Sequence, residues 1–162
     1  MSGQVASQNG EAAPRVRVSD ETLRAFAGYA LKRASNVIQA DLARTLEPFG
    51  LRMITFTALT LIADNPDLSQ TQLAGALAVE RSNLVTIVDD LERNGWITRN
   101  PAPNDRRSHA LRATLAGRRL CEKAVRAVQA HEDKLMAGLG AAERSMLIEI
   151  LGRIERSAGD GA

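Results

Sequence analysis

The chain has 162 residues, of which 44% are hydrophobic, 25% charged and only 3% aromatic, and its net charge is +2. This composition supports one mostly helical domain, or one core with helical extensions, and no apolar run approaches the roughly 20 residues of a membrane span. The N-terminus lacks the hydrophobic core of a secretion signal, and the single cysteine, Cys121, has no intrachain partner for a disulfide. We therefore expect a protein of the reducing cytoplasm.

Residues 1–18 are small and polar without periodicity, which predicts a flexible tail. Ser19 is the expected N-cap of a first helix, and apolar residues then recur at helical spacing from Leu23 to Leu46. Pro48 and Gly50 end this pattern. The stripe spans roughly seven turns, which is more than a small domain buries alone, so residues 19–50 are predicted to form an N-terminal dimerisation helix.

Residues 51–115 carry three shorter helical patterns and two strands. A helix over about 52–63 ends at an Asp-Asn-Pro-Asp turn, and Ser69 then caps a short helix with Gln72 at the capping-box position. Its inward residues are predicted to be Leu73, Ala76 and Leu77. After a break at residues 78–79, a further helix runs over about 81–94 with an inward stripe of Leu84, Ile87, Val88 and Leu91, and Gly95 stops it.

Two extended runs follow, over residues 96–99 and 109–114, and the link between them contains two prolines, so it is expected to be a loop. Residues 116–157 then carry two helical patterns, over about 115–139 and 141–156, broken at Gly138 and Gly140. The second is expected to bury Met146, Leu147, Ile150, Leu151 and Ile154. The chain is thus mainly α with a small β-wing: a winged helix-turn-helix between long terminal helices.

Charge is concentrated in one segment. Between Ile97 and Arg119 there are six arginines and one acid, Asp105, which gives +5 within a chain of +2 and leaves −3 for the rest. Because this charge coincides with the hairpin pattern, we interpret it as a surface for a polyanion. The alternative is an ordinary solvated face.

The helix over 81–94 has the polarity of a DNA recognition helix. With the apolar stripe inward, Ser82, Thr86, Asp89 and Arg93 point outward, so short polar side chains occupy the first turns and carboxylates the end. Such side chains bond base edges when a helix enters the major groove by its N-terminus. The residues predicted to contact DNA from this helix are Arg81, Ser82, Asn83 and Thr86; the alternative is an amphipathic surface helix.

Two further groups are predicted at the DNA. Ser69, Gln70 and Thr71 open the preceding helix, where free amides and short polar side chains suit a phosphate, although capping alone also explains Ser69. In the wing, Asp105 is predicted to brace Arg107 by a charge-assisted pair and to present it to the minor groove. Two more wing side chains are predicted to contact the DNA backbone: Arg106 and His109.

The stretch LSQTQLAGAL…SNLVTIVDDLERNGWITRNPAPNDRRSHALRATLAGRRL resembles the MarR family of transcriptional regulators. The resemblance covers nearly the whole chain after the tail, and its most specific parts are DDLERNGWI and the wing NDRR followed by LxxTLAG. In that family the wing Asp and the Arg two residues later form a characteristic pair, which maps onto Asp105 and Arg107. Ala78 departs from the family, which often has glycine there.

The resemblance implies a homodimer, with terminal helices interlocked, that binds double-stranded DNA as a ligand-responsive regulator, usually a repressor. It also implies a pseudo-palindromic operator, and release by a small effector, an aromatic acid or its acyl thioester. The candidate pocket residues at the junction of the dimerisation helices and the DNA-binding lobe are Phe26, Tyr29, Arg33, Phe49, Met53 and Phe56. Core packing is the alternative role for the phenylalanines and Met53, and exposure is the alternative for Arg33.

Other classes of protein fit less well. An architectural or non-specific nucleic-acid-binding protein could use the same wing charge. An enzyme is disfavoured, because the sequence has two histidines, one helical cysteine, and neither a phosphate loop nor a nucleophile elbow. Peroxide sensing by Cys121 and zinc sensing by His109 or His131 are disfavoured by spacing. We therefore expect no cofactor and no metal.

Overall fold

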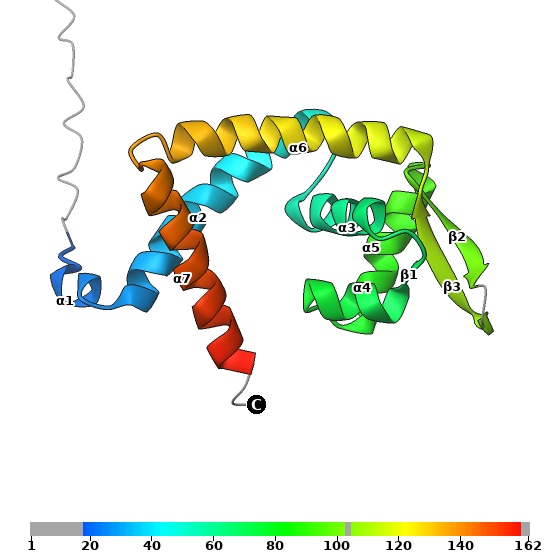
Figure 1. The fold of residues 1–162 in the computed structure, drawn as a ribbon, viewed down its shortest axis with the longest axis horizontal. Coiled ribbons are helices and arrows are strands. Elements are labelled where there is room, and N and C mark those ends of the chain that lie inside the picture. The colour runs from blue at the N-terminus through cyan, green and yellow to red at the C-terminus, as the bar shows by residue number, and fades with distance from the viewer. Residues whose placement is uncertain (1–17, 103–104, 160–162) are drawn as a thin grey trace, which may run out of the picture. The chain divides into compact units, whose positions relative to one another are not determined.

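The computed structural model describes residues 18–102 and 105–159, with the backbone alone described at 102, 105–109, 158 and 159. Apart from Val18, the predicted tail lies outside the described residues. The chain divides into two compact units, Met1–Ser35 and Asn36–Ala162, and Figure 1 shows the elements of both. No single described helix is long and apolar enough to cross a membrane, although the bent pair Ala27–Phe49 and Met53–Asp64 qualifies by length and composition.

The first unit corrects the prediction of one continuous N-terminal helix. Helix α1 spans only Glu21–Arg24, and α2, Ala27–Leu46, starts after a break at residues 25–26. Asp20, not Ser19, precedes α1. The carboxylate of Asp20 accepts hydrogen bonds from Arg24 Nε at 2.7 Å and from the Tyr29 hydroxyl at 2.9 Å. These bonds join α1 to the start of α2, and this folding back takes the place of a straight helix.

The second unit contains the end of α2 and all later elements. These are the 3₁₀ helix η1 (Glu47–Phe49), α3 (Met53–Asp64), β1 (Leu68–Ser69), α4 (Gln70–Leu77), α5 (Arg81–Arg93), β2 (Ile97–Ala102), β3 (Asp105–Ala113), α6 (Leu115–Leu135) and α7 (Ala141–Gly159). The predicted order of helices and strands in this part is therefore confirmed. The strand β1 was not predicted.

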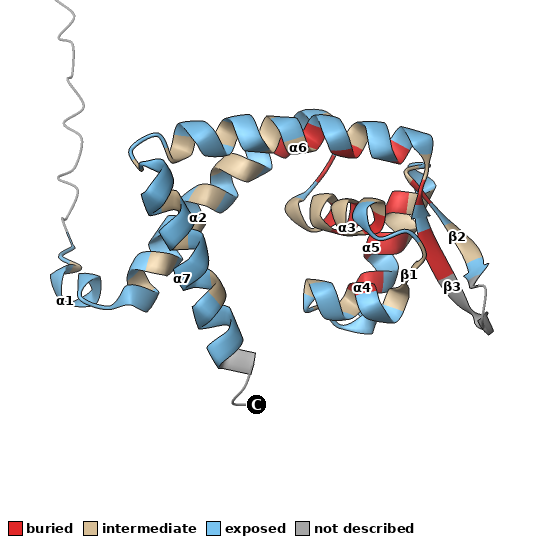
Figure 2. Ribbon diagram, viewed as in Figure 1, coloured by how far each residue is buried: buried red, intermediate tan, exposed pale blue. Residues whose placement is uncertain are grey.

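The hydrophobic core of the second unit gathers α3, α4, α5, the sheet and the first half of α6 (Figure 2). All four predicted inward residues of α5 are buried. In α4 the prediction was wrong at Ala76, which is exposed, because the inward side of this two-turn helix is formed by Leu73, Ala74 and Leu77. From α6, Cys121 and Ala124 complete the core.

The helix ends follow the predicted chemistry. Ser69 Oγ accepts the Gln72 N–H at 3.2 Å, and Gln72 Oε1 accepts the Ser69 N–H at 3.0 Å, which confirms the capping box. Ala78 ends α4 in the left-handed region at φ 50°, where glycine is usual. Gly95 follows α5 at φ 71°. The tight α4–α5 junction is therefore formed without a glycine, at some conformational cost.

The sheet is antiparallel in the order β1-β3-β2. The prediction that residues 100–105 form a loop was wrong at the described positions, because Asn100, Pro101 and Ala102 belong to β2 and Asp105 begins β3; positions 103 and 104 lie outside the described residues. Pro101 pairs with His109, and a register irregularity follows it. Proline is tolerated here because β2 is an edge strand that needs no N–H on its outer side.

Helix α7 was expected to bury its apolar residues, and within a single chain it does not. Met146 is 54% exposed and Ile154 48% exposed, and Ile148, Ile150 and Leu151 are exposed as well. The turn before α7 is held by Arg144, which donates to the carbonyl oxygens of Asp133 and Met136 at the end of α6. A helix with this much exposed apolar surface lacks part of its packing partner.

Candidate nucleic-acid interface

The N-terminal half of α5 presents short polar side chains to solvent. Arg81, Ser82, Asn83 and Thr86 are all exposed, and Val85 between them is 44% exposed. Their neighbours Leu84, Ile87 and Val88 are buried and fix the rotation of the helix. The structure therefore brings together the four α5 residues predicted to contact DNA, on one exposed helix tip with the chemistry to bond base edges.

The start of α4 supplies a second polar group. Gln70 is partly exposed and Thr71 is exposed, so both are accessible. The hydroxyl of Ser69 is already occupied, since it donates to Gln72 Oε1 at 2.8 Å and accepts the Gln72 N–H. Ser69 also pairs with Ala110 of β3, which ties the start of α4 to the wing strand. Capping is thus the established role of Ser69, and the open positions are Gln70 and Thr71.

The acidic end of α5 has a function that the sequence analysis missed. Arg99 of β2 forms ion pairs with Asp89 and with Glu92, the latter at 3.1 Å. The backbone N–H of Arg99 also donates to Glu92 Oε1 at 3.3 Å. These carboxylates therefore attach the wing to the recognition helix. The sequence contained a signal for this pairing. Arg99 is the first basic residue of the predicted strand, which follows α5 after the turn at Gly95.

The basic segment carries less free charge than its composition indicated. Arg99 is neutralised by α5, and Arg112 of β3 binds the carboxylate of Asp67 through two nitrogens, Nη2 to Oδ2 at 2.6 Å. This contact holds the pKa of Asp67 below its ordinary 3.8. Arg118 donates to the carbonyl oxygen of Ala113 at 3.1 Å. Three of the four arginines whose side chains are described in this segment thus have internal partners.

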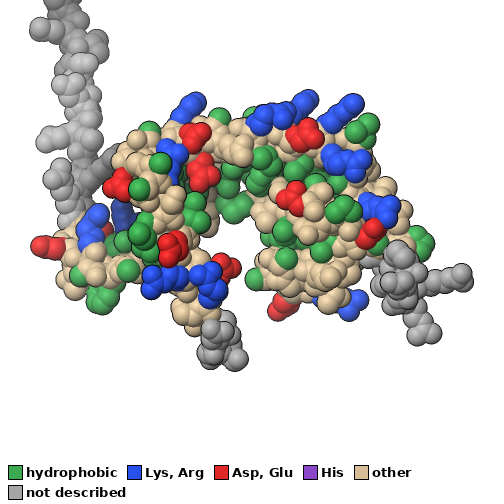
Figure 3. All heavy atoms as spheres, in the orientation of Figure 1, with side chains coloured by type: hydrophobic (Ala, Val, Ile, Leu, Met, Phe, Trp, Pro, Cys, Tyr) green, Lys and Arg blue, Asp and Glu red, His purple; other side chains and the backbone are tan. Residues whose placement is uncertain are grey.

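The other basic side chains are distributed over two places. Arg119 lies on the exposed side of α6 with Lys123 and Arg126, where Figure 3 shows a row of Lys and Arg side chains. The four predicted wing residues, Asp105, Arg106, Arg107 and His109, belong to β3, and their side chains lie outside the described residues. The predicted Asp105–Arg107 pair therefore stays a prediction.

The effector candidates fall in both units of the chain. In the first unit, the Arg33 guanidinium lies 5.8 Å from the centroid of the Tyr29 ring and 3.6 Å from Asp20 Oδ2, and Phe26 is exposed. In the second unit, Phe49 and Phe56 pack against the core, as the alternative interpretation held. Met53 lines a surface hollow of about 440 Å³ beside Arg44 and Arg52.

Cys121 is buried beside Thr60, with 3.4 Å between its Sγ and the threonine Oγ1. Burial raises the pKa of the Cys121 thiol above its ordinary value, so the thiolate needed for redox reactivity is disfavoured at neutral pH. Among the described side chains, no group of three or more His, Cys, Asp and Glu residues is placed to hold a metal ion.

The helices α3, α4 and α5, followed by a two-stranded hairpin on a third short strand, form a winged helix-turn-helix. With the exposed polar tip of α5, this arrangement defines a DNA-binding protein of the winged-helix class. A model of the MarR family matches residues 51–109.

A Thauera aromatica protein named for transcriptional regulation of the hcr operon is 36% identical over 130 residues, which cover 80% of this chain and 78% of that protein. The transcriptional repressor CouR bound to a 23-mer DNA duplex is 36% identical with a TM-score of 0.81, covering 86% of this chain and 99% of that one. CouR bound to p-coumaroyl-CoA is 33% identical with a TM-score of 0.77 and the same coverage. The chain belongs to the MarR family of transcriptional regulators.

Proposed function

We propose that this regulator is a sequence-specific repressor that binds a pseudo-palindromic operator as a homodimer and is released by a small aromatic acid or its acyl thioester. The observation that carries the proposal is the tip of α5, where Ser82, Asn83 and Thr86 are exposed above a buried apolar stripe. Hydroxyl and amide groups at the start of such a helix discriminate base edges in the major groove. A merely electrostatic DNA-binding surface has no need of this group.

The homodimer is supported by the terminal helices. Apolar side chains are exposed along α7, and Leu23 and Phe26 at the N-terminal end of the chain are exposed too. A second copy of the chain is the simplest cover for these residues, since two-fold pairing joins identical patches. The two α5 helices of such a dimer would read half-sites about 34–36 Å apart.

The effector class is supported by similarity. CouR, with which this chain shares about a third of its residues, binds p-coumaroyl-CoA. In this chain the aromatic and cationic candidates are Phe26, Tyr29 and Arg33. Arg33 contributes a guanidinium that lies over a tyrosine ring, and this combination suits a carboxylate or phosphate attached to an aromatic group. The effector must bind the form that cannot bind DNA more tightly than the form that can.

The experiment is a selection of duplexes from a random library, followed by footprinting of the selected sequence. We expect one protected site with two-fold symmetry, and uniform coverage would instead identify an architectural protein. The complex is then titrated with p-coumaroyl-CoA and with p-coumarate. Release by either one supports the effector class, and retention of the complex at saturating concentrations of both contradicts it.

A further inference from the structure

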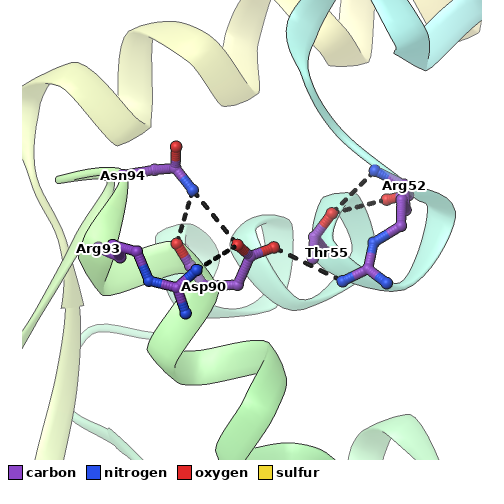
Figure 4. A network of polar contacts seen from close by, with 5 residues as sticks. All are labelled: Arg52, Thr55, Asp90, Arg93 and Asn94. Atoms are coloured by element: carbon purple, nitrogen blue, oxygen red, sulfur yellow. Dashed lines mark hydrogen bonds and ion pairs between the residues drawn. The ribbon is translucent and has the colours of Figure 1, made fainter.

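Asp90 of α5 lies at the centre of a polar network that connects the C-terminal end of α5 with the residue before α3 (Figure 4). Its Oδ2 is 3.5 Å from Nη2 of Arg52, the residue before α3, and its Oδ1 is 3.8 Å from Nη1 of Arg93. The side-chain amide Nδ2 of Asn94 donates to the Asp90 backbone carbonyl at 2.7 Å. The contact with Arg52 is the only one of these that leaves α5 and its C-cap.

The backbone of Arg52 is a fixed support. Its N–H donates to Thr55 Oγ1 at 2.9 Å, and the same hydroxyl donates back to the Arg52 carbonyl oxygen at 3.0 Å. Thr55 is buried, and so is the preceding residue, Leu51. The backbone of Arg52 is thus held by α3, and its guanidinium extends from there toward α5.

Packing of apolar side chains between α3 and α5 gives the recognition helix its approximate crossing angle. Polar contacts at its C-terminal half restrain it further on two sides. Arg99 holds Asp89 and Glu92 toward the wing, and Arg52 holds Asp90 toward α3. Asn83 is seven residues from Asp90, about 10 Å along the helix, so a small rotation at Asp90 displaces the tip that meets DNA.

The two attachments differ in exposure. The Arg99 side chain is 25% exposed, whereas that of Arg52 is 67% exposed and that of Asp90 33%. A pair as exposed as Arg52–Asp90 adds little to stability, so its loss leaves the fold intact. We infer that Arg52 and Asp90 are positioning residues, which hold the recognition helix at the tilt that operator binding requires. This inference rests on the proposed function, since it concerns the same helix tip.

The test is a double-mutant cycle with Arg52→Gln, Asp90→Asn and the double variant. Binding is measured by fluorescence anisotropy on a duplex selected by the wild type and on an unrelated duplex of equal length. On the selected duplex, each single variant binds about threefold to fivefold more weakly, the range expected for an exposed ion pair, and the double variant binds no more weakly than either. Arg52→Lys restores most of the affinity.

The Asp90→Asn variant separates positioning from plain electrostatics. Removing a negative charge near DNA strengthens non-specific binding, so Asp90→Asn binds the unrelated duplex more tightly than the wild type while it binds the selected duplex more weakly. If Asp90→Asn binds both duplexes more tightly, the inference is overturned. If it binds both equally more weakly, the loss of affinity comes from partial unfolding, and the inference is overturned as well. Arg93→Gln is the matched control, because Arg93 contacts the same carboxylate from within α5 and does not connect α5 with α3.

Failure of the proposed function has a different signature. If the wild type selects no duplex, sequence-specific binding is absent, and the inference is then decided without DNA by hydrogen exchange of the α5 backbone amides. Arg52→Gln and Asp90→Asn should each speed exchange near Asp90 by about threefold to fivefold, with no further gain in the double variant. Unchanged exchange in both variants rejects the positioning role.

Discussion

Arg99 in β2 and Glu92 in α5 are joined through both side chain and backbone. The distance between Arg99 Nη1 and Glu92 Oε2 is 3.1 Å, and Glu92 Oε1 accepts the Arg99 backbone N–H at 3.3 Å. The first strand of the wing is thereby bound to the recognition helix close to its C-terminal end.

Arg99→Ala should therefore lower the free energy of unfolding by about 1–2 kcal/mol, because it removes charge-assisted hydrogen bonds and leaves Asp89 and Glu92 next to each other unneutralised. Urea denaturation followed by circular dichroism measures this. The control is Arg119→Ala, which removes the same charge from an exposed position on α6 and should change stability by less than about 0.5 kcal/mol. Equal effects of the two variants would mean that the Arg99 contacts are not structural.

Gly117, in the first turn of α6, permits close contact between that helix and Trp96, the residue before β2. A Cβ at this position would overlap the carbonyl oxygen of Trp96 and lie 2.8 Å from its carbonyl carbon. That carbonyl is fixed, since it accepts the Thr114 N–H at 2.9 Å. Gly117→Ala should destabilise the protein by about 2–3 kcal/mol, measured as a fall in the midpoint of thermal unfolding.

Gly75→Ala is the matched control for that prediction. Gly75 is also helical, in α4, and a Cβ there meets no atom within 4 Å. Alanine restricts the unfolded chain and favours the helix, so the free energy of unfolding of this variant should be about 0.5–1 kcal/mol higher. Two changes of the same type thus have opposite signs, and a loss of stability in both would refute the steric argument for Gly117.

Asp67 gives a pH dependence with a definite sign. Its hydrogen bond with Arg112 lowers the pKa of the carboxyl group in the folded chain below the ordinary 3.8, so the pair stabilises the fold above that value and is lost as pH falls through the lowered pKa. The Tm difference between wild type and Asp67→Asn should be constant from about pH 5 to 7 and should shrink below about pH 4. Asparagine keeps the left-handed backbone of position 67, at φ 69°.

The partner variant checks the cause. In an Arg112→Gln background, Asp67→Asn should leave the pH dependence of Tm nearly unchanged, because the cation that lowers the pKa is absent. A persistent pH-dependent difference there would assign the shift to a group other than Arg112.

The sequence predicted the fold correctly where a structural feature depends only on residues close together in the chain. The Ser69–Gln72 capping box, the buried stripe of α5 and the stop at Gly95 all depend on neighbours within a few residues, and all are confirmed. Ala76 and Pro101 were placed wrongly, because the burial of Ala76 depends on how α4 packs and the tolerance of Pro101 depends on β2 being an edge strand. Both features depend on tertiary structure.

The site shows the same division. The exposure of Ser82, Asn83 and Thr86 follows from helical periodicity and was predicted. The partners of Arg99 and Arg112 were not, since Arg112 meets Asp67 across 45 residues and a count of charges treats every arginine as free. Pairing of charges over such separations is set by strand register, which a single sequence does not specify.

The exposed apolar stripe of α7 predicts that Ile150 lies in the interface of the proposed homodimer. Met146, Ile150 and Ile154 follow one another at four-residue intervals and are all exposed, so one substitution places a charge in the middle of the stripe. Ile150→Glu should yield monomers at micromolar concentration, measured by analytical ultracentrifugation, because an unpaired carboxylate cannot be buried without a large desolvation penalty. Operator affinity should fall by about 100-fold or more, since two linked half-site contacts become independent.

Ser145→Glu is the control, because it adds the same charge on another side of α7 and should leave the dimer intact. If the Ile150→Glu protein is still a dimer, this stripe is not the interface.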